Sequence, residues 1–402
     1  MSGNAKAGHS PAASSFFYLL ALGLLCAFGP LCTDIYLPGL PAICNYYGID
    51  TSTAQLSLTS CFLGLAFGQI VAGPISDALG RKKPMLISVA VFAVSSLLCA
   101  TASSAIELIV WRFIQGFAGA GGLVISRSIA CDSYQGEKFT RFMSLLMTIN
   151  SVAPVAGPVI GSALITFFSW HGVFVFLAFF GTGLLVLAFL SVPESLMSEK
   201  RQAKILSSFG SMFGECRNLR FMLYVCSLSF VMGGFFSYLA ASPFVFQIIY
   251  AYSPLEYSLV FALIAVSISV TAFCAGRLAG RTGDRRILSV ALILMMLAGM
   301  CILIFSIWQP SSSIPVIVAL MLYCTMMGTS QTVGFGIVMS SRRGGAGSAS
   351  GLYGVMNFLF GALMTPLAGI LGDHSMLPLG LCLLLNAAAA FGTYFWAESL
   401  KK

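Results

Sequence analysis

The chain has 402 residues, of which 58% are hydrophobic and 8% are charged, and its mean hydropathy is +0.93. Soluble domains are typically about 25% charged and about 45–50% apolar, so this composition excludes a soluble protein and indicates an integral membrane protein. Apolar runs near 20 residues, rather than alternating segments of about 10, favour helical spans and an all-α fold. The net charge of +8 is explained by topology, as described below.

The apolar runs, read between polar breaks, predict twelve membrane-spanning helices. Their expected ranges are 15–37, 54–76, 84–103, 107–130, 141–167, 172–192, 220–241, 255–277, 287–307, 313–339, 348–371 and 377–397. The largest polar break separates two groups of six spans. We therefore expect an N-terminal six-helix bundle over 1–192, a cytoplasmic linker over 193–219 and a C-terminal six-helix bundle over 220–402.

Lys and Arg are distributed asymmetrically about these spans. Nineteen of the 21 lie at the termini and in the even-numbered loops, while Arg112 and Arg127 lie within the fourth span. The odd-numbered loops contain none, so the positive-inside rule places both termini and the linker in the cytoplasm. We expect a multi-pass protein of the bacterial inner membrane, with the lipid bilayer and no nucleic acid as a partner.

The twelve cysteines are scattered, mostly inside apolar runs, and form no CxxC pair. Small buried side chains are therefore expected in place of a disulfide framework. The sequence also lacks a metal-ligand cluster, a nucleotide-binding loop and a nucleophile triad. These features argue against an enzyme, and no metal or organic cofactor is expected.

The first span contains a single charged residue, Asp34, near its expected outer end. A carboxylate within a membrane helix costs roughly 2.5–3.5 kcal/mol on insertion scales, so its default interpretation is a proton or ion site. No obvious cleavage site precedes the span, and we interpret it as a retained helix, not as a removed signal peptide.

The loop after the second span, Gly73–Lys83, is repeated after the eighth span as Gly276–Arg286. Both loops contain glycines seven residues apart, followed by basic residues. Two six-span halves repeated in parallel are the architecture of the major facilitator fold, which places the substrate between the halves and rocks them for alternating access. Within the first loop, Asp77 is expected to face the positive N-terminal end of the eleventh span near Gly347.

The fourth span begins outside near Glu107, so Arg112 and Asp34 should lie at similar heights in the membrane. Arg112 would favour the ionised form of Asp34 if the two are close, whereas burial would favour the neutral form. We expect Asp34 to couple protons and Arg112 to tune or gate it; a fixed ion pair is the alternative. Arg127 lies about 22 Å deeper, where it either anchors the helix at the interface or faces the cavity.

Small residues form a stripe along the fifth span. Ala153, Gly157 and Gly161 recur every four residues and share one face. Pro154 and Pro158 bend the helix and free carbonyl groups. The eighth span offers small residues as partners, so we expect interdomain helix packing here, with ordinary packing as the alternative.

Aromatic and amide residues of the central helices are candidates for substrate contact, because small amphipathic ligands bind in apolar pockets with a few polar groups. The candidates are Tyr36, Gln115, Arg127, Asn150, Phe235, Phe236, Tyr238, Gln331, Tyr353 and Asn357. For each of them, packing or helix bonding is the competing interpretation.

Several motifs resemble a known family. Asp77–Lys82 resembles the loop 2–3 signature of the major facilitator superfamily, although Ala78 stands where a basic residue is usual. Leu108–Gly116 is similar to the family's fourth-helix motif. Ala153–Ser162 is similar to its fifth-helix motif, with Ser162 where glycine is common. The segments most similar to the bicyclomycin/chloramphenicol-resistance (Bcr/CflA) subfamily of drug/proton antiporters are Asp34–Pro41, Pro193–Glu194, Ser242–Phe244 and Gly347–Ser350.

The resemblance implies a conformational latch on the cytoplasmic side, formed by Gly73, Asp77, Gly80 and Arg81. The resemblance also implies that the stripe of small residues on the fifth helix is the motif typical of antiporters. The implied function is proton-coupled export of small amphipathic drug-like compounds, of the multidrug or bicyclomycin/phenicol type, by a functional monomer. The alternative is a transporter of one endogenous metabolite, such as a sugar or siderophore, on the same fold.

Overall fold

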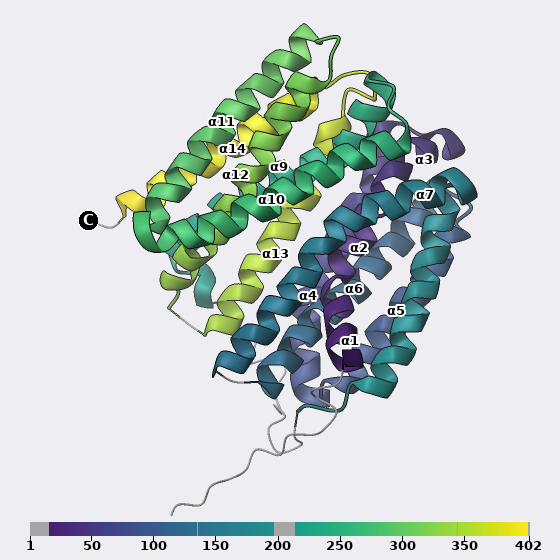
Figure 1. The fold of residues 1–402 in the computed structure, drawn as a ribbon, viewed down its shortest axis with the longest axis vertical. Coiled ribbons are helices and arrows are strands. Elements are labelled where there is room, and N and C mark those ends of the chain that lie inside the picture. The colour runs from purple at the N-terminus through teal and green to yellow at the C-terminus, as the bar shows by residue number, and fades with distance from the viewer. Residues whose placement is uncertain (1–15, 135, 197–213, 344, 401–402) are drawn as a thin grey trace, which may run out of the picture.

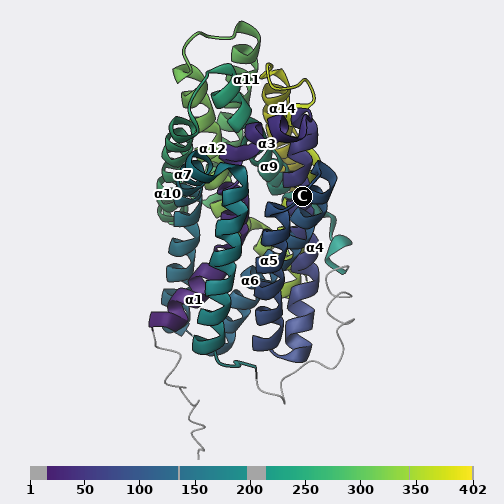
Figure 2. The same ribbon diagram turned by 90° about the vertical axis from the view of Figure 1, so that its right-hand side faces the viewer.

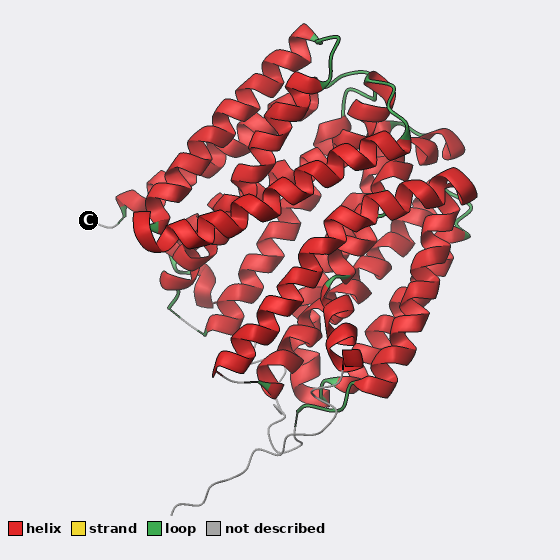
Figure 3. Cartoon of the chain, in the orientation of Figure 1, coloured by secondary structure: helices red, strands yellow, loops and turns green. Residues whose placement is uncertain are grey.

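The computed structural model describes residues 16–134, 136–196, 214–343 and 345–400, and every regular element in these ranges is helical (Figure 3). The predicted all-α class is confirmed for this part of the chain. The elements are α1 (Phe16–Cys26), α2 (Phe28–Asp34), η2 (Leu37–Gly39), α3 (Leu40–Tyr47), α4 (Thr51–Leu79), α5 (Lys82–Ala100), α6 (Ala105–Ser133), α7 (Gly136–Ser191), α9 (Leu219–Phe244), η4 (Val245–Ile249), α10 (Pro254–Thr282), α11 (Asp284–Trp308), α12 (Ile314–Ser340), α13 (Ala346–Met364), η5 (Pro366–Gly369) and α14 (Leu377–Ser399).

The number of spans follows from two interrupted helices. Within the described ranges, ten helices are long and apolar enough to cross a membrane, and the bent pair Phe16–Cys26 and Phe28–Tyr47 raises the number to eleven. Helix α7 is 56 residues long, but Ser169 has a non-helical backbone with φ 60° and ψ −178°. The kink at Ser169 divides α7 into the predicted fifth and sixth spans, which brings the total to the expected twelve.

The first span is broken, which corrects the expectation of a continuous helix over 15–37. The chain bends by 52° between Cys26 and Phe28 and then continues to Tyr47. Pro30 has no N–H to donate to the carbonyl group of Cys26, and its ring crowds that carbonyl, so the bend falls at this point. A second irregularity follows Asp34, where α2 ends and η2 begins three residues later.

The helices form two groups that lie side by side, α1–α7 in one and α9–α14 in the other (Figure 1). Viewed from the side, most of the long helices run in the same general direction (Figure 2). The two groups contact each other through α4 with α13 and through α7 with α10. The ends of the predicted linker lie between them in sequence, and its residues 197–213 fall outside the described ranges.

Glycines bring α4 and α6 into close contact within the first half. A Cβ atom on Gly64 would lie 2.2 Å from the carbonyl oxygen of Phe113, and one on Gly116 would lie 2.2 Å from that of Cys61. Any side chain at these positions would push the two backbones apart. This packing holds α6, and hence Arg112, at a fixed position beside the first two spans.

Hydrogen bonds between the halves lie at one end of the molecule. They are Gln247 Nε2 to Pro38 O (3.1 Å), Gln55 Nε2 to Ala240 O (3.0 Å), Ser52 Oγ to Pro366 O (3.2 Å) and Ser258 Oγ to Pro158 O (2.8 Å). The first three join segments that the charge distribution places on the outer side, and the fourth joins Pro158, inside α7, to the first turns of α10.

Candidate functional site

Asp34 lies at the last residue of α2 and is 5% exposed. Thr33 Oγ1 donates a hydrogen bond to Asp34 Oδ1 over 2.9 Å. Among the described carboxylates, only Asp34 and Glu215 are buried, and Glu215 lies outside the spans. Asp34 is thus a membrane-embedded carboxylate held by a neutral hydroxyl, at a point where the helix is interrupted.

The glycine stripe of α7 packs against Asp34 and its neighbour. A Cβ atom on Gly157 would lie 3.4 Å from Asp34 Cβ, and one on Gly161 would lie 2.0 Å from the carbonyl oxygen of Ile35. This corrects the expectation for the two glycines, because their nearest atoms belong to the first span of the same half. Close approach at Gly161 needs a residue without a Cβ, since the backbone of Ile35 is the neighbour, whereas the contact at Gly157 is only tight.

Pro158 does lie where the two halves meet. Its carbonyl oxygen accepts a hydrogen bond of 2.8 Å from Ser258 at the start of α10. Ala153 is buried, and Pro154 lies one turn before Pro158 inside the same helix. Helix α7 therefore uses adjacent faces for two contacts, one with α2 in its own half and one with α10 across the interface.

Arg112 on α6 is fully buried, at 0% exposure. Its Nη1 donates to the carbonyl oxygen of Cys32 over 2.9 Å and also to Gln115 Oε1. The guanidinium lies 4.7 Å from the ring centroid of Tyr36 and 5.7 Å from that of Phe174. Its Nε and Nη2 atoms have no hydrogen-bond partner among the described residues. Two buried donors of a permanent cation are therefore unused in this conformation.

Asp34 and Arg112 reach the same stretch of the first span without forming an ion pair. The guanidinium binds the carbonyl of Cys32, two residues before Asp34, which agrees with the expected similar heights. Asp34 is bonded to Thr33 of its own helix, and η2, which begins three residues after Asp34, contacts α9 and α10 of the other half. The alternative of a fixed ion pair does not describe this conformation.

Gln115 and Tyr36, which the sequence predicted to line the substrate cavity, pack around Arg112. Gln115 Nε2 donates to Ser96 Oγ over 2.7 Å, and the Tyr36 hydroxyl lies 2.7 Å from Ser57 Oγ. Both side chains are completely buried within the first half. Their polar atoms are thereby bonded to neighbouring helices and hold the guanidinium in place.

Aromatic residues gather where the two halves meet. The ring centroid of Phe236 lies 4.2 Å from that of Phe62 in the first half and 5.6 Å from that of Phe358. Phe235 lies 5.9 Å from Phe236 and 6.0 Å from Tyr238. Phe62 and Phe358 were missed by the sequence analysis, because a phenylalanine in an apolar helix carries no signal of which neighbour it meets.

The remaining candidates of the second half form a polar network. Gln331 Nε2 donates to the carbonyl oxygen of Leu228 over 2.9 Å, and its Oε1 accepts from the Tyr353 hydroxyl. Ser229 Oγ donates to Asn357 Oδ1 over 3.2 Å. These bonds join α12 and α13 to α9 within one half.

Arg127 and Asn150 differ in burial: the first side chain is exposed, whereas the oxygen of the second is buried. The Arg127 side chain is exposed near the linker end of α6, and both interpretations of its role remain expectations. Asn150 Oδ1 on α7 is buried and accepts no hydrogen bond from a described residue. Asn150 is therefore a polar group with capacity to bind a ligand.

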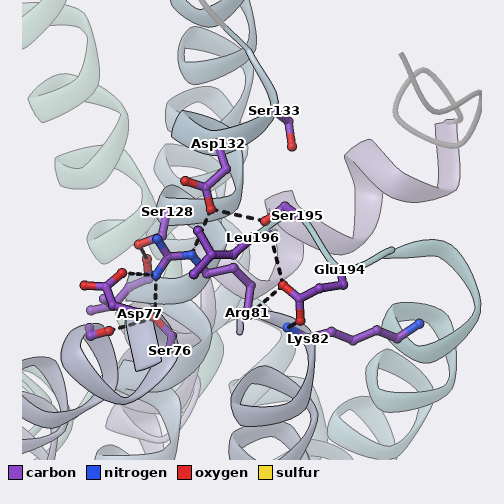
Figure 4. A network of polar contacts seen from close by, with 12 residues as sticks. Ser76, Asp77, Arg81, Lys82, Ser128, Asp132, Ser133, Glu194, Ser195 and Leu196 are labelled. Atoms are coloured by element: carbon purple, nitrogen blue, oxygen red, sulfur yellow. Dashed lines mark hydrogen bonds and ion pairs between the residues drawn. The ribbon is translucent and has the colours of Figure 1, made fainter. Parts of the chain in front are cut away.

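Arg81 is the centre of a polar cluster at the linker end of the first half (Figure 4). Its Nε lies 2.8 Å from Asp132 Oδ2, its Nη1 donates to Ser76 Oγ over 2.7 Å, and it is paired with Asp77. Glu194 accepts from the backbone N–H groups of Arg81 (2.8 Å) and of the following residue (3.1 Å). Every residue of this cluster belongs to the first half or to the start of the linker.

The expected partner of Asp77 at the start of α13 is not engaged in this conformation. Asp77 is bonded to Arg81 and has no hydrogen bond or ion pair to a described residue of α13. Gly80 has φ +89°, so the turn after α4 favours glycine. A Cβ atom on Gly73 would meet a single atom, Val124 Cγ1 at 3.9 Å, so Gly73 is not a site of tight packing here.

The ranges that the structure describes contain no group of three or more His, Cys, Asp or Glu residues that could hold a metal ion. Cys32 Sγ and Cys61 Sγ lie 3.8 Å apart beside the Arg112 site, and both thiols are free and buried. The chemistry of the site is therefore that of one carboxylate, one guanidinium and neutral polar groups.

Comparison with known proteins places this geometry in context. The sequence profile of the Major Facilitator Superfamily matches residues 20–366. The chain is 36% identical to the uncharacterized MFS-type transporter YdgK of Bacillus subtilis (strain 168), over 93% of each chain. It is 27% identical to the bicyclomycin resistance protein homolog of Haemophilus influenzae, over 94% of this chain and 96% of the relative. A bacterial homolog of the human lysosomal transporter Spinster, in an inward-facing and occupied conformation, superimposes with a TM-score of 0.78 at 15% identity over 98% of both chains.

Proposed function

Because the chain belongs to the Major Facilitator Superfamily, we propose that it is a proton-coupled antiporter that exports small amphipathic drug-like compounds. Family membership makes the protein a membrane transporter and not an enzyme, with the expected fold class. The similarity to a bicyclomycin resistance protein homolog supports efflux as the direction of transport. Protons serve as the coupling ion in this proposal.

The observation that carries the proposal is the position of Asp34. It is the buried carboxylate of the described spans, it ends a broken helix, and η2, which begins three residues later, contacts α9 and α10 of the opposite half. Rocking of the halves changes these contacts and, with them, the surroundings of Asp34. A carboxylate whose surroundings change in this way binds a proton in one state and releases it in the other.

Arg112 supports the same proposal. Its unused Nε and Nη2 donors are buried near the turn that carries Asp34. Ionised Asp34 in another conformation would find these donors available, and its negative charge would be stabilised by them. In this scheme, the guanidinium stabilises the deprotonated form and thereby assists proton release.

The substrate would bind between the halves, where Phe236, Phe62 and Tyr238 provide aromatic surface. Apolar walls with a few polar groups suit small amphipathic compounds. The hydrogen bonds between the halves at their outer ends support assignment of this conformation as inward-facing. The proposed setting is the bacterial inner membrane, with both termini and the linker cytoplasmic and the monomer as the functional unit.

The decisive experiment compares wild type with Asp34→Asn in cells that lack their own exporters and in proteoliposomes. We expect Asp34→Asn to lose resistance to phenicol or bicyclomycin-type drugs and to lose substrate-driven proton release. Exchange of labelled for unlabelled drug at equal pH should continue, because that reaction moves no net proton. Asp373→Asn, which neutralises a carboxylate in a loop near the outer end, is the matched control and should behave as wild type.

Unchanged proton release by Asp34→Asn would show that Asp34 is not the coupling residue. A growth requirement without any change in drug susceptibility would favour the metabolite transporter over the drug exporter.

A further inference from the structure

Two thiol groups meet inside the first half. Cys32 Sγ on α2 and Cys61 Sγ on α4 lie 3.8 Å apart, and both cysteines are free and completely buried. Cys32 Sγ donates a hydrogen bond to the carbonyl oxygen of Gly29 over 3.1 Å. Its single S–H is used in that bond, so the sulfur faces Cys61 as an acceptor. The proposed proton coupling uses neither thiol.

The two sulfur atoms are close enough to form a covalent bond after a small movement. A disulfide bond is about 2.05 Å long, so the sulfurs must approach each other by roughly 1.8 Å. Rotation of a side chain between staggered positions moves its sulfur without any change in the backbone. Helix α2 can also shift against α4, because it has only 7 residues, follows the 52° bend and ends at Asp34.

A permanent cation adjoins the two thiols. Arg112 Nη1 donates to the carbonyl oxygen of Cys32 over 2.9 Å, and the Nε and Nη2 atoms have no hydrogen-bond partner among the described residues. Gly116, one turn after Arg112 on α6, packs against the backbone of Cys61, since a Cβ there would lie 2.2 Å from the Cys61 carbonyl oxygen. One face of α6 therefore meets both cysteines. A neighbouring cation stabilises a thiolate, which is the reactive form of cysteine.

In the proposed orientation, the two thiols lie in the outer part of the membrane. Cys61 is about 15 Å along α4 from Thr51, at the outer end, and about 27 Å from Leu79, at the cytoplasmic end. The bacterial periplasm is an oxidising compartment, whereas glutathione and thioredoxin keep thiols reduced in the cytosol. The shorter path from the thiols therefore leads to the oxidising side.

We propose that Cys32 and Cys61 form a reversible disulfide when they meet a peroxide, and that this bond fixes α2 to α4. The Cys61 thiol attacks hydrogen peroxide, the O–O bond breaks, and a sulfenic acid and one water form. The Cys32 sulfur then displaces the hydroxyl group of the sulfenic acid, which leaves as a second water with the Cys32 proton. Two thiols are thereby oxidised to one disulfide, and one hydrogen peroxide is reduced to two waters.

The disulfide joins a segment that moves to one that is held in place. Rocking of the halves reaches the first span through η2, which contacts α9 and α10. Helix α4 is held against α6 by the close contacts of Gly64 and Gly116. A bond at Cys32, two residues before Asp34, therefore restrains the coupling carboxylate and halts proton-driven transport. This consequence for transport rests on the proposed function, whereas the cross-link itself does not.

The test uses the full chain, purified, placed in nanodiscs and treated with hydrogen peroxide. Wild type is compared with Cys61→Ser, which removes one sulfur of the pair, and with Cys26→Ser, which removes a buried thiol of α1 outside the pair. The remaining thiols are alkylated under denaturing conditions, and mass spectrometry of proteolytic peptides identifies the linked cysteines. Hydrogen exchange of the α2 amides is measured before and after oxidation. Proton-driven transport is measured in proteoliposomes after peroxide and again after dithiothreitol.

We expect wild type and Cys26→Ser to yield peptides linked through Cys32 and Cys61, slower exchange in α2, and a loss of transport that dithiothreitol reverses. Cys61→Ser should yield no such link and should keep its untreated exchange and transport rates. Recovery of Cys32 and Cys61 as separate thiols or sulfinic acids overturns the proposal, and so does a link that leaves the exchange of α2 unchanged. If untreated wild type shows no proton-driven transport, the proposed function fails, and the linked peptides and the exchange rates still decide this proposal.

Discussion

Asp34 and Arg112 illustrate what a residue type can and cannot reveal. The sequence singles them out as charges within spans, and the helix directions place them at similar heights. Whether they pair depends on side-chain direction, which the spacing along a helix does not specify. In the structure, Arg112 bonds to a carbonyl group and to Gln115, and Asp34 bonds to Thr33.

Arg112→Lys tests whether the charge or the shape of this side chain is needed. A lysine retains the charge but cannot lie flat against Tyr36 while donating to Cys32 and Gln115. We expect proton-driven transport to fall by about 10- to 100-fold, since one charge-assisted contact is worth roughly 1.5–3 kcal/mol. Initial transport rates in proteoliposomes provide the measurement.

Arg217→Lys, at an exposed position outside the spans, is the control and should keep the wild-type rate. Full transport by Arg112→Lys would mean that a point charge is sufficient at this site.

At the level of elements, α7 shows how one helix serves two partners. The spacing of Ala153, Gly157 and Gly161 correctly indicates a smooth face, but a smooth face does not name its partner. The partner of the two glycines is the interrupted first span, because the break after Asp34 brings its backbone next to α7. The interface with α10 instead uses the carbonyl group of Pro158.

Gly161→Ala tests this packing. The added methyl group would lie 2.0 Å from the carbonyl oxygen of Ile35, so α7 or the first span must move. We expect a loss of roughly 1–3 kcal/mol in stability, as for other overpacked sites, and reduced transport because Asp34 is displaced. The thermal midpoint and the transport rate are the two readouts.

Gly183→Ala on the same helix is the matched control, because its methyl group would meet no atom within 4 Å. That change should leave transport intact and raise helix stability by roughly 0.5–1 kcal/mol. If both variants have the same thermal midpoint and transport rate, the close contact between α7 and the first span contributes to neither stability nor transport.

For the whole molecule, the position of the contacts between the halves is the central feature. The bonds formed by Gln247, Gln55, Ser52 and Ser258 join the outer ends, while Asp77 is bonded within its own half. The proposed latch therefore belongs to a conformation in which α13 approaches α4 on the linker side. Its energetic contribution is roughly 0.3–1 kcal/mol for a carboxylate facing a helix N-terminus.

Asp77→Asn is expected to shift the population toward the inward-facing state by roughly two- to fivefold, because the neutral amide loses this attraction. Transport should fall while drug binding is nearly unchanged. Distances between spin labels on the linker-side ends of α4 and α13 measure the population.

Asp132→Asn is the control, because it removes a different partner of Arg81 and leaves Asp77 unchanged. If the two variants shift the population equally, the effect acts through Arg81 and the latch is contradicted.

The membrane class, the number of spans, the two-part repeat and the identity of the embedded charges can all be read from the sequence. These properties follow from hydrophobic run length, charge distribution and the cost of burying a carboxylate, all of which are written along the chain. The bend at Pro30, the contact of Gly157 and Gly161 with the first span, and the separate bonding of Asp34 and Arg112 became evident from the folded chain alone. Each of these depends on which surface of one helix meets which neighbour, and that choice is made by the packing of all helices together.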